Sequence, residues 1–327
     1  MIKDNARILI IGAGVNGSIC AARLHTHGAN VTVLARGSRY QELRDLGIVI
    51  ENPFNLTRTV TRVPVIDRLE LQDAYDYILV IVRKNQVADL YPVLRENRSP
   101  NVVFMINNPS GPQEYIQALG PERVLMGFVF GAGKRDGSLI RGMSFAWKSG
   151  RMASWVMGSP FGEPDGTLTP RLKRLVSLLQ QAGFPAATTR HISDELATHA
   201  AMVAPLAGFF MQRGFDPDAL RRYSIADLSI LVEAMRQVTQ VLHAVGVRVD
   251  SGNAVTLRLL PKVVWAALFK AMLPTKFLEV GAIFHLTQAP DEMRQLIKET
   301  QALVERSGLA VPALRNCLRL ADTAALK

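Results

Sequence analysis

The glycine pattern near the N-terminus constrains the fold more than any other feature of the sequence. An apolar run at residues 8–11 passes directly into Gly12, Gly14 and Gly17, and a helix-like segment with a second apolar run follows over residues 18–34. In a strand-turn-helix context, the first glycine permits a tight turn, the second lets a pyrophosphate approach the backbone, and the third lets the helix pack closely against the strand. The pattern therefore predicts a dinucleotide site with the anion at the helix N-terminus.

The end of the second predicted strand indicates which dinucleotide binds. Sites for NAD place an Asp or Glu there for the ribose 2′-hydroxyl, whereas an Arg accommodates the 2′-phosphate of NADP. This chain has no acid there: Arg36 occupies the position, and Arg39 follows it. A guanidinium can receive a phosphate through two parallel hydrogen bonds. We therefore expect NADP as the cofactor; the alternative is that both arginines are solvated loop residues.

The rest of the chain predicts an α/β fold with two domains. Apolar runs alternate with helical segments through the first half, and the continuous run at residues 77–82 is typical of a strand buried on both faces of a parallel sheet. From about His191 onward the pattern is helical. At 327 residues the chain is long enough for two cores. We expect a Rossmann-type doubly wound sheet that binds NADP at residues 1–190, followed by an all-helical substrate and dimerisation domain at residues 191–327.

Composition argues against several other classes of protein. The formal charge is +10, but the cations are scattered in ones and twos, so a field that attracts an anionic cofactor explains the charge and we expect no nucleic-acid partner. Cys20 and Cys317 belong to no Cys/His cluster, which predicts neither a disulfide framework nor a metal site. The start lacks a secretory signal, and the most apolar later stretch, residues 263–273, is too short to span a bilayer. We expect a cytoplasmic protein with no membrane partner.

Five segments of the sequence resemble the ketopantoate reductases (2-dehydropantoate 2-reductases). They are Gly-Ala-Gly-Val-Asn-Gly at 12–17, Ala-Arg-Gly at 35–37 with the Leu-Arg and Gly that follow, Val-Arg-Lys-Asn-Gln at 82–86, Asn-Asn-Pro-Ser-Gly at 107–111, and Gly-Leu-Ala-Val-Pro at 308–312. The resemblance covers nearly the whole chain. It implies NADPH-dependent reduction of a 2-oxo acid to a 2-hydroxy acid in a cleft between the two domains, as in pantothenate biosynthesis. It also implies a helical domain that often supports a homodimer.

The resemblance assigns most of the cofactor site to matching residues. The cofactor-binding residues that it implies are Gly12, Gly14, Gly17, Arg36, Arg83, Gln86 and Asn108. Arg83 stands where the family has a Lys, and Pro109 stands where the family has a Gly after its Asn. Asn108 would also be catalytic, because its family counterpart lies close to the nicotinamide and the substrate.

The substrate site departs from the family pattern. The catalytic Lys position holds Leu196, and the family's two helix Asn positions hold Ala200 and Ala204. The family's substrate-binding Glu falls on Glu292. We therefore expect a more apolar pocket, an altered 2-oxo acid substrate, and a proton donor other than the family Lys.

His199 is the leading substitute for the missing proton donor. It follows Leu196 by three residues, so the two side chains share a helix face, and histidine titrates near neutrality. The alternative is a histidine packed in the helical core. Lys84 is a second candidate, with a solvent-facing side chain as its alternative reading.

Two classes of function fit these residues. The first is an NADPH-dependent oxidoreductase, and the second is a non-catalytic NADP-binding, redox-responsive protein that kept the cofactor site after losing the acid. The first is favoured because Asn108, Gln86 and Glu292 have no obvious use in a protein that only binds the nucleotide.

Overall fold

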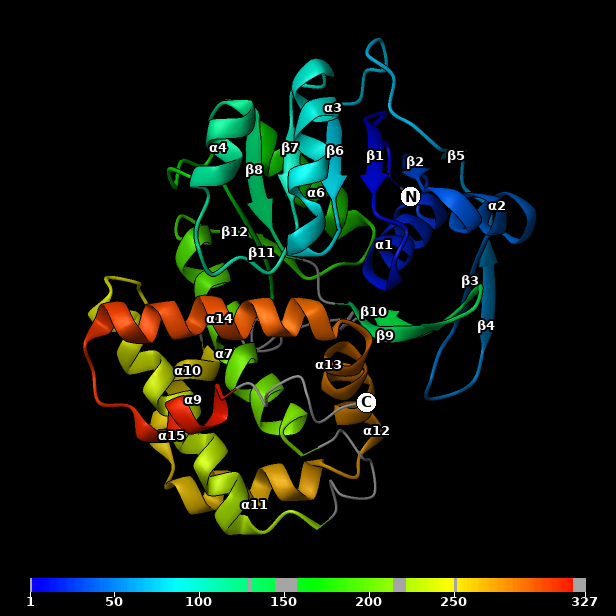
Figure 1. Cartoon of the computed structure of the whole chain (residues 1–327). Helices are drawn as coiled ribbons and strands as arrows, with labels where there is room; N and C mark the ends of the chain where they lie inside the picture. Colours follow the sequence, from blue (N-terminus) through cyan, green and yellow to red (C-terminus); the bar gives the residue numbers. More distant parts are fainter. Residues whose placement is uncertain (1, 129–130, 145–157, 214–221, 250–251, 320–327) are drawn as a thin grey trace. The chain divides into compact units, whose positions relative to one another are not determined.

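The computed structural model describes residues 2–128, 131–144, 158–213, 222–249 and 252–319 (Figure 1). These residues form two compact units. The first comprises residues up to Asn107 together with Gly111–Ser193, and the second comprises Asn108–Ser110 together with the chain from Asp194. The short turn at Asn108–Ser110 belongs to the second unit, although the residues on both sides of it belong to the first.

An eight-stranded sheet forms the centre of the first unit, in the order β12-β11-β8-β7-β6-β1-β2-β5. The strands are β1 (Arg7–Ile11), β2 (Asn30–Leu34), β5 (Val65–Ile66), β6 (Tyr77–Val80), β7 (Val102–Phe104), β8 (Val124–Gly127), β11 (Ser159–Gly162) and β12 (Ala186–Thr188). All neighbouring pairs are parallel except β8 with β11. From β5 to β8 the order is that of a doubly wound dinucleotide-binding sheet, so the predicted α/β fold is confirmed.

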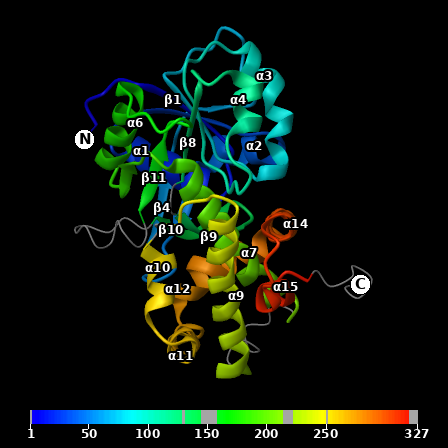
Figure 2. The same cartoon turned by 90° about the vertical axis from the view of Figure 1, so that its left-hand side faces the viewer.

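Helices cover both faces of this sheet. They are α1 (Val15–Thr26), α2 (Gly37–Leu46), α3 (Tyr91–Glu96), α4 (Gln113–Leu119) and α6 (Pro170–Gln181). α1 and α6 lie on one face, and α3 and α4 lie on the other (Figures 1 and 2). The apolar run of β6 is fully buried between these layers, as its unbroken hydrophobic sequence predicts.

A second, smaller sheet in the first unit joins segments that are far apart in the sequence. Its order is β4-β3-β10-β9, with β3 (Ile48–Glu51), β4 (Arg58–Thr61), β9 (Gly131–Asp136) and β10 (Leu139–Ser144). β9 and β10 form an antiparallel hairpin, and β10 pairs parallel with β3. α1 packs against β9 and β10, so this sheet lies beside the helix that follows the glycine motif.

In the second unit, every regular element among the described residues is helical. The elements are α7 (Ile192–Met211), α9 (Ile225–Ala244), α10 (Gly252–Leu259), α11 (Lys262–Met272), α12 (Lys276–Leu278), a π-helical turn (Glu279–Ile283), α13 (Phe284–Gln288), α14 (Pro290–Ser307) and α15 (Pro312–Cys317). α9 is the central helix, because α10, α11, α14 and α15 all pack against it. At Gly208 a Cβ would lie 1.9 Å from the Cys317 carbonyl oxygen, so a glycine is required where α7 meets α15.

Candidate active site

The three glycines of the turn after β1 differ in how much space surrounds them. Gly12 has φ +111°, and a Cβ on it would lie 2.1 Å from the Ile81 carbonyl oxygen. A Cβ on Gly17 would lie 1.8 Å from the Gly12 carbonyl oxygen. Around Gly14, in contrast, an added Cβ meets no atom within 4 Å. The first and third glycines are therefore required by the protein's own packing, whereas the space at the second is open to a ligand.

This turn lies at the switch point of the sheet. β1 pairs with β2 on one side and with β6 on the other, and the chain winds outward from β1 in both directions. In open α/β sheets, ligands bind at such a point, outside the carboxyl ends of the strands. The Ile81 amide donates to the Ile11 carbonyl oxygen at 2.8 Å, so the carboxyl ends of β1 and β6 are held side by side there.

The N-terminus of α1 offers its backbone to an anion. Gly14 is the N-cap residue, and no side chain caps the helix. The first amides of a helix have no partner within the helix, and the helix dipole places partial positive charge there. A pyrophosphate fits this terminus, with the open space at Gly14 allowing its approach.

The two arginines after β2 have different environments. Arg36 is exposed and is the N-cap residue of α2, which also has no side-chain cap. Arg39 is buried: its guanidinium donates to the Ala13 carbonyl oxygen at 3.1 Å and to Ser18 Oγ at 3.2 Å, and it pairs with Glu42 at 2.9 Å. Burial lowers the pKa of Arg39 from its usual value. Arg39 therefore braces the glycine turn from within, and of these two arginines Arg36 is the exposed one.

The two cations of the turn after β6 lie in different environments. Arg83 is exposed, and its backbone amide donates to Gln86 Oε1 at 3.2 Å, which closes the 3-10 turn at Lys84–Gln86. Lys84 is buried, so the alternative of a solvent-facing side chain is wrong. Its Nζ lies 3.5 Å from Glu114 Oε2 and 5.4 Å from the centre of the Tyr115 ring. Lys84 is thus a buried cation at the end of β6. The Gln86 side chain stabilises the turn by accepting the hydrogen bond from the Arg83 amide.

The Asn108 turn is held by a chain of hydrogen bonds in the second unit. Asn108 is 1% exposed, and its Oδ1 accepts a hydrogen bond from the Ser110 amide at 3.2 Å. Ser110 Oγ donates to Glu299 Oε2 at 2.8 Å. Gln295 Nε2 donates to Glu299 Oε1 at 2.9 Å. The turn is therefore fastened to α14 by a carboxylate whose two oxygens both accept hydrogen bonds.

Glu292 belongs to the same face of α14 as these groups. It lies in the first turn, where the helix dipole favours an acid, yet only 6% of it is exposed. Gln295 and Glu299 follow at intervals of three and four residues, which places the three side chains along one face. The sequence pattern predicted a role for Glu292 but none for Ser110 or Glu299. The seven-residue spacing from Glu292 to Glu299, two helical turns, was the signal that could have indicated Glu299.

The residues of α7 that replace the family's polar groups are buried. Leu196 is 2% exposed, and Ala200 and Ala204 are 0% exposed. Both alanines belong to the core of the helical unit, so they fill that core. His199, on the same helix, is partly exposed. Its proposed role as proton donor stays a prediction.

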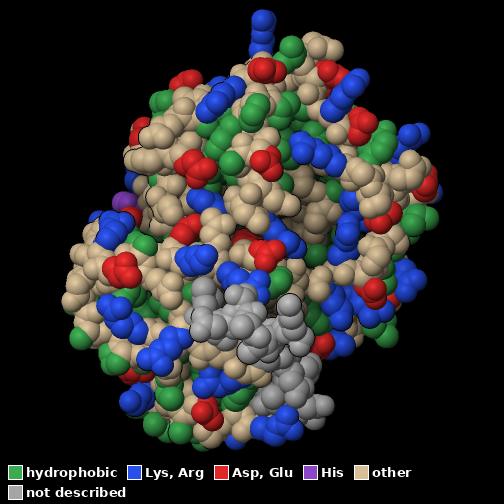
Figure 3. Space-filling model, viewed as in Figure 1, with side chains coloured by type: hydrophobic (Ala, Val, Ile, Leu, Met, Phe, Trp, Pro, Cys, Tyr) green, Lys and Arg blue, Asp and Glu red, His purple; other side chains and the backbone are tan. Residues whose placement is uncertain are grey.

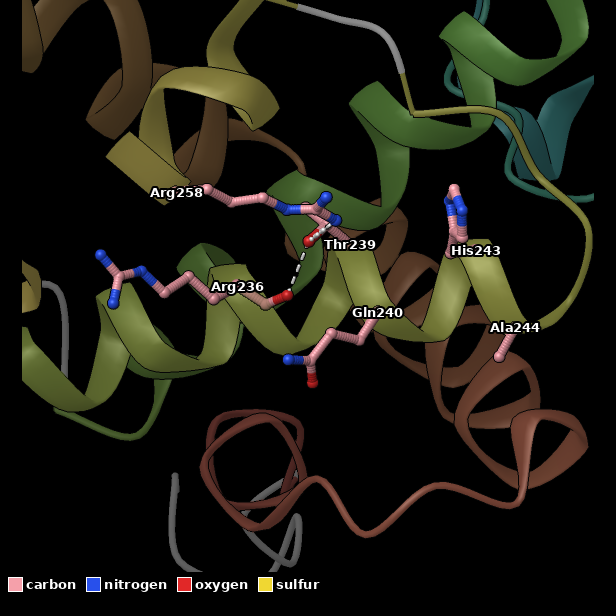
Figure 4. A pocket seen from close by; sticks show the side chains of 6 residues that line it. All are labelled: Arg236, Thr239, Gln240, His243, Ala244 and Arg258. Atoms are coloured by element: carbon pink, nitrogen blue, oxygen red, sulfur yellow. Dashed lines mark hydrogen bonds between the residues drawn. The ribbon is translucent and has the colours of Figure 1, made fainter. Parts of the chain in front are cut away.

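A cavity of about 630 Å³ lies elsewhere on the helical unit (Figure 4). It is lined by Arg236, Thr239, Gln240, His243, Ala244 and Arg258. The arginines have structural partners there: Arg258 donates to Thr239 Oγ1 at 2.8 Å, and Arg236 donates to the Leu257 and Leu260 carbonyl oxygens at the end of α10. None of the residues expected at the active site lines this cavity.

Both cysteines are buried, and the surface carries mixed charge. Cys20 and Cys317 are both buried and unpaired, and burial raises the pKa of the Cys20 thiol to about 12. Within the described ranges, no group of His, Cys, Asp and Glu side chains is arranged to hold a metal ion. The helices that the structure describes include none that is long and apolar enough to cross a membrane. On the face in Figure 3, Lys and Arg side chains are interspersed with Asp and Glu.

Comparison with known proteins finds a sequence similarity to the ketopantoate reductases in part of the chain. Residues 8–144 match the family model described as ketopantoate reductase PanE/ApbA. No curated protein matches the chain.

Solved structures share the fold over nearly the full length. A 2-dehydropantoate 2-reductase from Geobacter metallireducens GS-15 is 17% identical with a TM-score of 0.74, covering 95% of this chain and 97% of that one. One from Methylococcus capsulatus is 22% identical with a TM-score of 0.64, covering 95% and 94%. A D-mandelate dehydrogenase with NADH and anilino(oxo)acetate is 15% identical with a TM-score of 0.71, covering 95% and 96%. The predicted resemblance is thus confirmed: this chain resembles the ketopantoate reductases in sequence over residues 8–144 and shares their two-part fold.

Proposed function

We propose that this protein is an NADPH-dependent reductase that converts a 2-oxo acid to a 2-hydroxy acid. The observation that carries the proposal is the open backbone at Gly14, at the switch point of the sheet, together with the exposed Arg36 at the end of β2. The family model that matches is named for a reductase, and D-mandelate dehydrogenase was solved with NADH and anilino(oxo)acetate. The choice of NADPH over NADH rests on Arg36 and on the absence of an acid at that position.

The proposed roles follow from the chemistry of carbonyl reduction. NADPH supplies a hydride to the carbonyl carbon, and the carbonyl oxygen then needs a hydrogen-bond donor and a proton. The Asn108 amide would orient that oxygen, and His199 would give the proton, with Lys84 as the rival donor. Arg83 would receive a phosphate or the substrate carboxylate, and Glu292 would bind the substrate. The pyrophosphate would lie at Gly12, Gly14 and Gly17, and Gln86 would keep the turn at Arg83 in place.

The cofactor preference gives a direct test of Arg36. We expect wild-type protein to bind NADPH at least about tenfold more tightly than NADH, which is about 1.4 kcal/mol. Arg36→Ala should remove most of this difference, since the 2′-phosphate loses a charged, bidentate partner. Isothermal titration with both nucleotides measures the ratio. Arg44→Ala is the matched control, because Arg44 is also exposed on α2 but lies in its last turn. Equal affinities in the wild type would refute the assignment.

We further propose that Ser110 and Glu299 position Asn108 for this reaction. The Ser110 amide fixes the Asn108 side-chain oxygen, and the Ser110 hydroxyl ties the turn to Glu299. A hydrogen bond to a charged group typically contributes about 1.5–3 kcal/mol, enough to select one arrangement of the turn.

Ser110→Ala and Glu299→Gln should each lower kcat by about tenfold, or ~1.4 kcal/mol, while the NADPH dissociation constant stays unchanged. Ser110→Thr, which keeps the hydroxyl, should recover most of the loss. Glu305→Gln, an exposed acid on the same helix, is the matched control and should behave like the wild type. A fall in NADPH affinity with kcat unaltered would show that the pair acts on the fold of the cofactor site instead.

One observation supports the alternative of a non-catalytic NADP-binding protein. The positions of the family's Lys and Asn residues hold Leu196, Ala200 and Ala204, all of them buried and apolar. If neither His199 nor Lys84 donates a proton, the chain would bind the nucleotide without turnover. Turnover with 2-oxo acids separates the two functions.

A further inference from the structure

Arg135, at the end of β9, lies on the face of the second sheet that packs against α1 (Figure 1). In the register of the β9–β10 hairpin it is directly opposite Ile140, and opposite residues of an antiparallel pair share a face. Ile140 is fully buried in the core of the first unit. At Gly131, on the same face of β9, an added Cβ would lie 2.8 Å from Asn16 Oδ1 and 3.7 Å from Ile19 Cδ1, both on α1. This face of the hairpin, with Arg135 on it, therefore covers the helix that begins at the glycine turn.

The charged neighbours of Arg135 lie on the other face of the hairpin, where they pair with one another. Adjacent residues of a strand point to opposite faces. Asp136 Oδ2 lies 4.0 Å from Arg141 Nη2, and Glu51 Oε1 of β3 lies 3.3 Å from Arg141 Nε. The Arg135 side chain is exposed and has no hydrogen bond or ion pair with any residue that the structure describes. The two acids thus compensate Arg141, and Arg135 has no counterion in the described part of the chain.

Arg135 lies close to the buried guanidinium of Arg39. Burial is the main cause of the lowered pKa of Arg39, and the positive charge of Arg135 lowers that pKa further. A like charge has this effect only at short range. Arg39 donates to the Ala13 carbonyl oxygen in the glycine turn, pairs with Glu42, and lies in the first turn of α2, whose N-cap residue is Arg36. Three arginines are thus gathered around the glycine turn and the start of α2, and Glu42 pairs with one of them.

This concentration of positive charge favours an anion. Like charges that stand close together repel one another, and an anion that binds beside them relieves the repulsion. The N-terminus of α2 adds partial positive charge and has no side-chain cap. In a doubly wound sheet the adenosine ribose of the dinucleotide is recognised at the end of the second strand, and α2 begins directly after that strand. Arg36 and Arg135 are both exposed, so an anion can reach them from solvent.

We propose that Arg135 is a second cation that recognises the 2′-phosphate of NADPH, together with Arg36. The inference rests on the proposed preference for NADPH, and it adds a specificity-determining residue from a hairpin that is remote in sequence from the glycine motif. A phosphate monoester carries a charge of about −1.5 to −2 at pH 7 and three acceptor oxygens. It can therefore accept hydrogen bonds from two guanidiniums at once. The 2′-hydroxyl of NADH is uncharged, so Arg135 discriminates between the two dinucleotides.

The nucleotide affinity of Arg135→Ala tests the proposal. Isothermal titration of the full chain should show NADPH binding weakened about tenfold, or ~1.4 kcal/mol, and the NADH dissociation constant changed less than about twofold. The fragment 2′,5′-ADP, which carries the 2′-phosphate without the nicotinamide, should lose affinity by the same factor as NADPH. Arg135→Lys keeps the charge without the planar fork and should recover part of the loss. The melting temperature of the free protein should not fall, since the side chain has no partner among the described residues.

Arg98→Ala is the matched control. Arg98 is also an exposed arginine of the first unit, but it precedes β7, at the amino end of the parallel strands, whereas ligands bind at their carboxyl ends. This variant should bind NADPH, NADH and 2′,5′-ADP like the wild type.

Two results would overturn the role of Arg135 and leave the proposed cofactor intact. In the first, Arg135→Ala binds NADPH as tightly as a wild type that prefers NADPH to NADH, so that Arg36 alone accounts for the preference. In the second, Arg135→Ala loses affinity for NADPH and NADH by the same factor, which would assign Arg135 to the pyrophosphate that both carry. A wild type that binds the two dinucleotides equally would instead refute the NADPH assignment, and this proposal with it.

Discussion

Gly14→Ala should weaken NADPH binding on the order of 100-fold, or about 2.7 kcal/mol, without destabilising the protein. Gly14 has φ −73° and ψ −164°, which any residue can adopt, and the added Cβ would meet no protein atom within 4 Å. The methyl group would occupy space that only the pyrophosphate needs. Isothermal titration and a thermal melt measure the two effects, and the melting temperature should stay within about 2 °C of wild type.

Gly17→Ala, unlike Gly14→Ala, should destabilise the protein. Its Cβ would lie 1.8 Å from the Gly12 carbonyl oxygen, a backbone atom that cannot move aside without opening the turn. We expect it to lower the free energy of unfolding by about 3 kcal/mol or more, beyond the loss of NADPH binding. If Gly14→Ala bound NADPH as tightly as wild type, the backbone at Gly14 would not face the cofactor, and the assigned site would be wrong.

His199→Ala should lower kcat by about 10²–10⁴-fold, the usual contribution of general acid catalysis, while NADPH binds as before. The reason is that the family's polar positions on α7 hold Leu196, Ala200 and Ala204, which are buried and carry no proton donor. Steady-state kinetics with the preferred 2-oxo acid measures kcat, and a nucleotide titration checks binding. His243→Ala, at an exposed histidine of α9, is the matched control.

Lys84→Met identifies the rival donor. Lys84 is buried, pairs with Glu114 and lies over the Tyr115 ring, so its removal leaves Glu114 without that partner and calls for a parallel thermal melt. If Lys84→Met remains folded and loses kcat while His199→Ala turns over like wild type, the proton comes from Lys84. The histidine would then have no part in the chemistry.

Local patterns in the sequence were sufficient to predict most of the fold. The unbroken apolar run of β6 and the helical periods of α4 and α11 match the structure closely, because burial on both faces and a 3.6-residue repeat leave direct traces in sequence. The parallel pairing of β3 with β10 could not be predicted in this way. That pairing joins distant segments, and nothing local in either one specifies the other.

The candidate site was harder to predict, because side-chain direction depends on where a helix begins. Arg36 and Arg39 are three residues apart and would share a face within one helix. Arg36, however, is an N-cap residue with extended backbone (φ −121°, ψ 157°), so the two do not share a helix face. Arg36 is exposed, whereas Arg39 is buried and donates to the Ala13 carbonyl oxygen. The 3-10 turn after β6 likewise buries Lys84 and exposes Arg83.

The exposed apolar side of α11 also could not be predicted from the sequence. Hydrophobic residues at helical spacing predict a core helix, and α11 does pack one side against α9. Its second apolar side shows only when the exposure of Val264 and Leu268 is known.

Turnover of NADPH with a panel of 2-oxo acids, ketopantoate included, tests the central claim most directly. We predict that at least one acid makes NADPH absorbance fall, with one 2-hydroxy acid formed for each NADPH oxidised, and that Arg36→Ala weakens the use of NADPH but not of NADH. Tight NADPH binding with no turnover of any 2-oxo acid would contradict the reductase and leave the nucleotide-binding alternative.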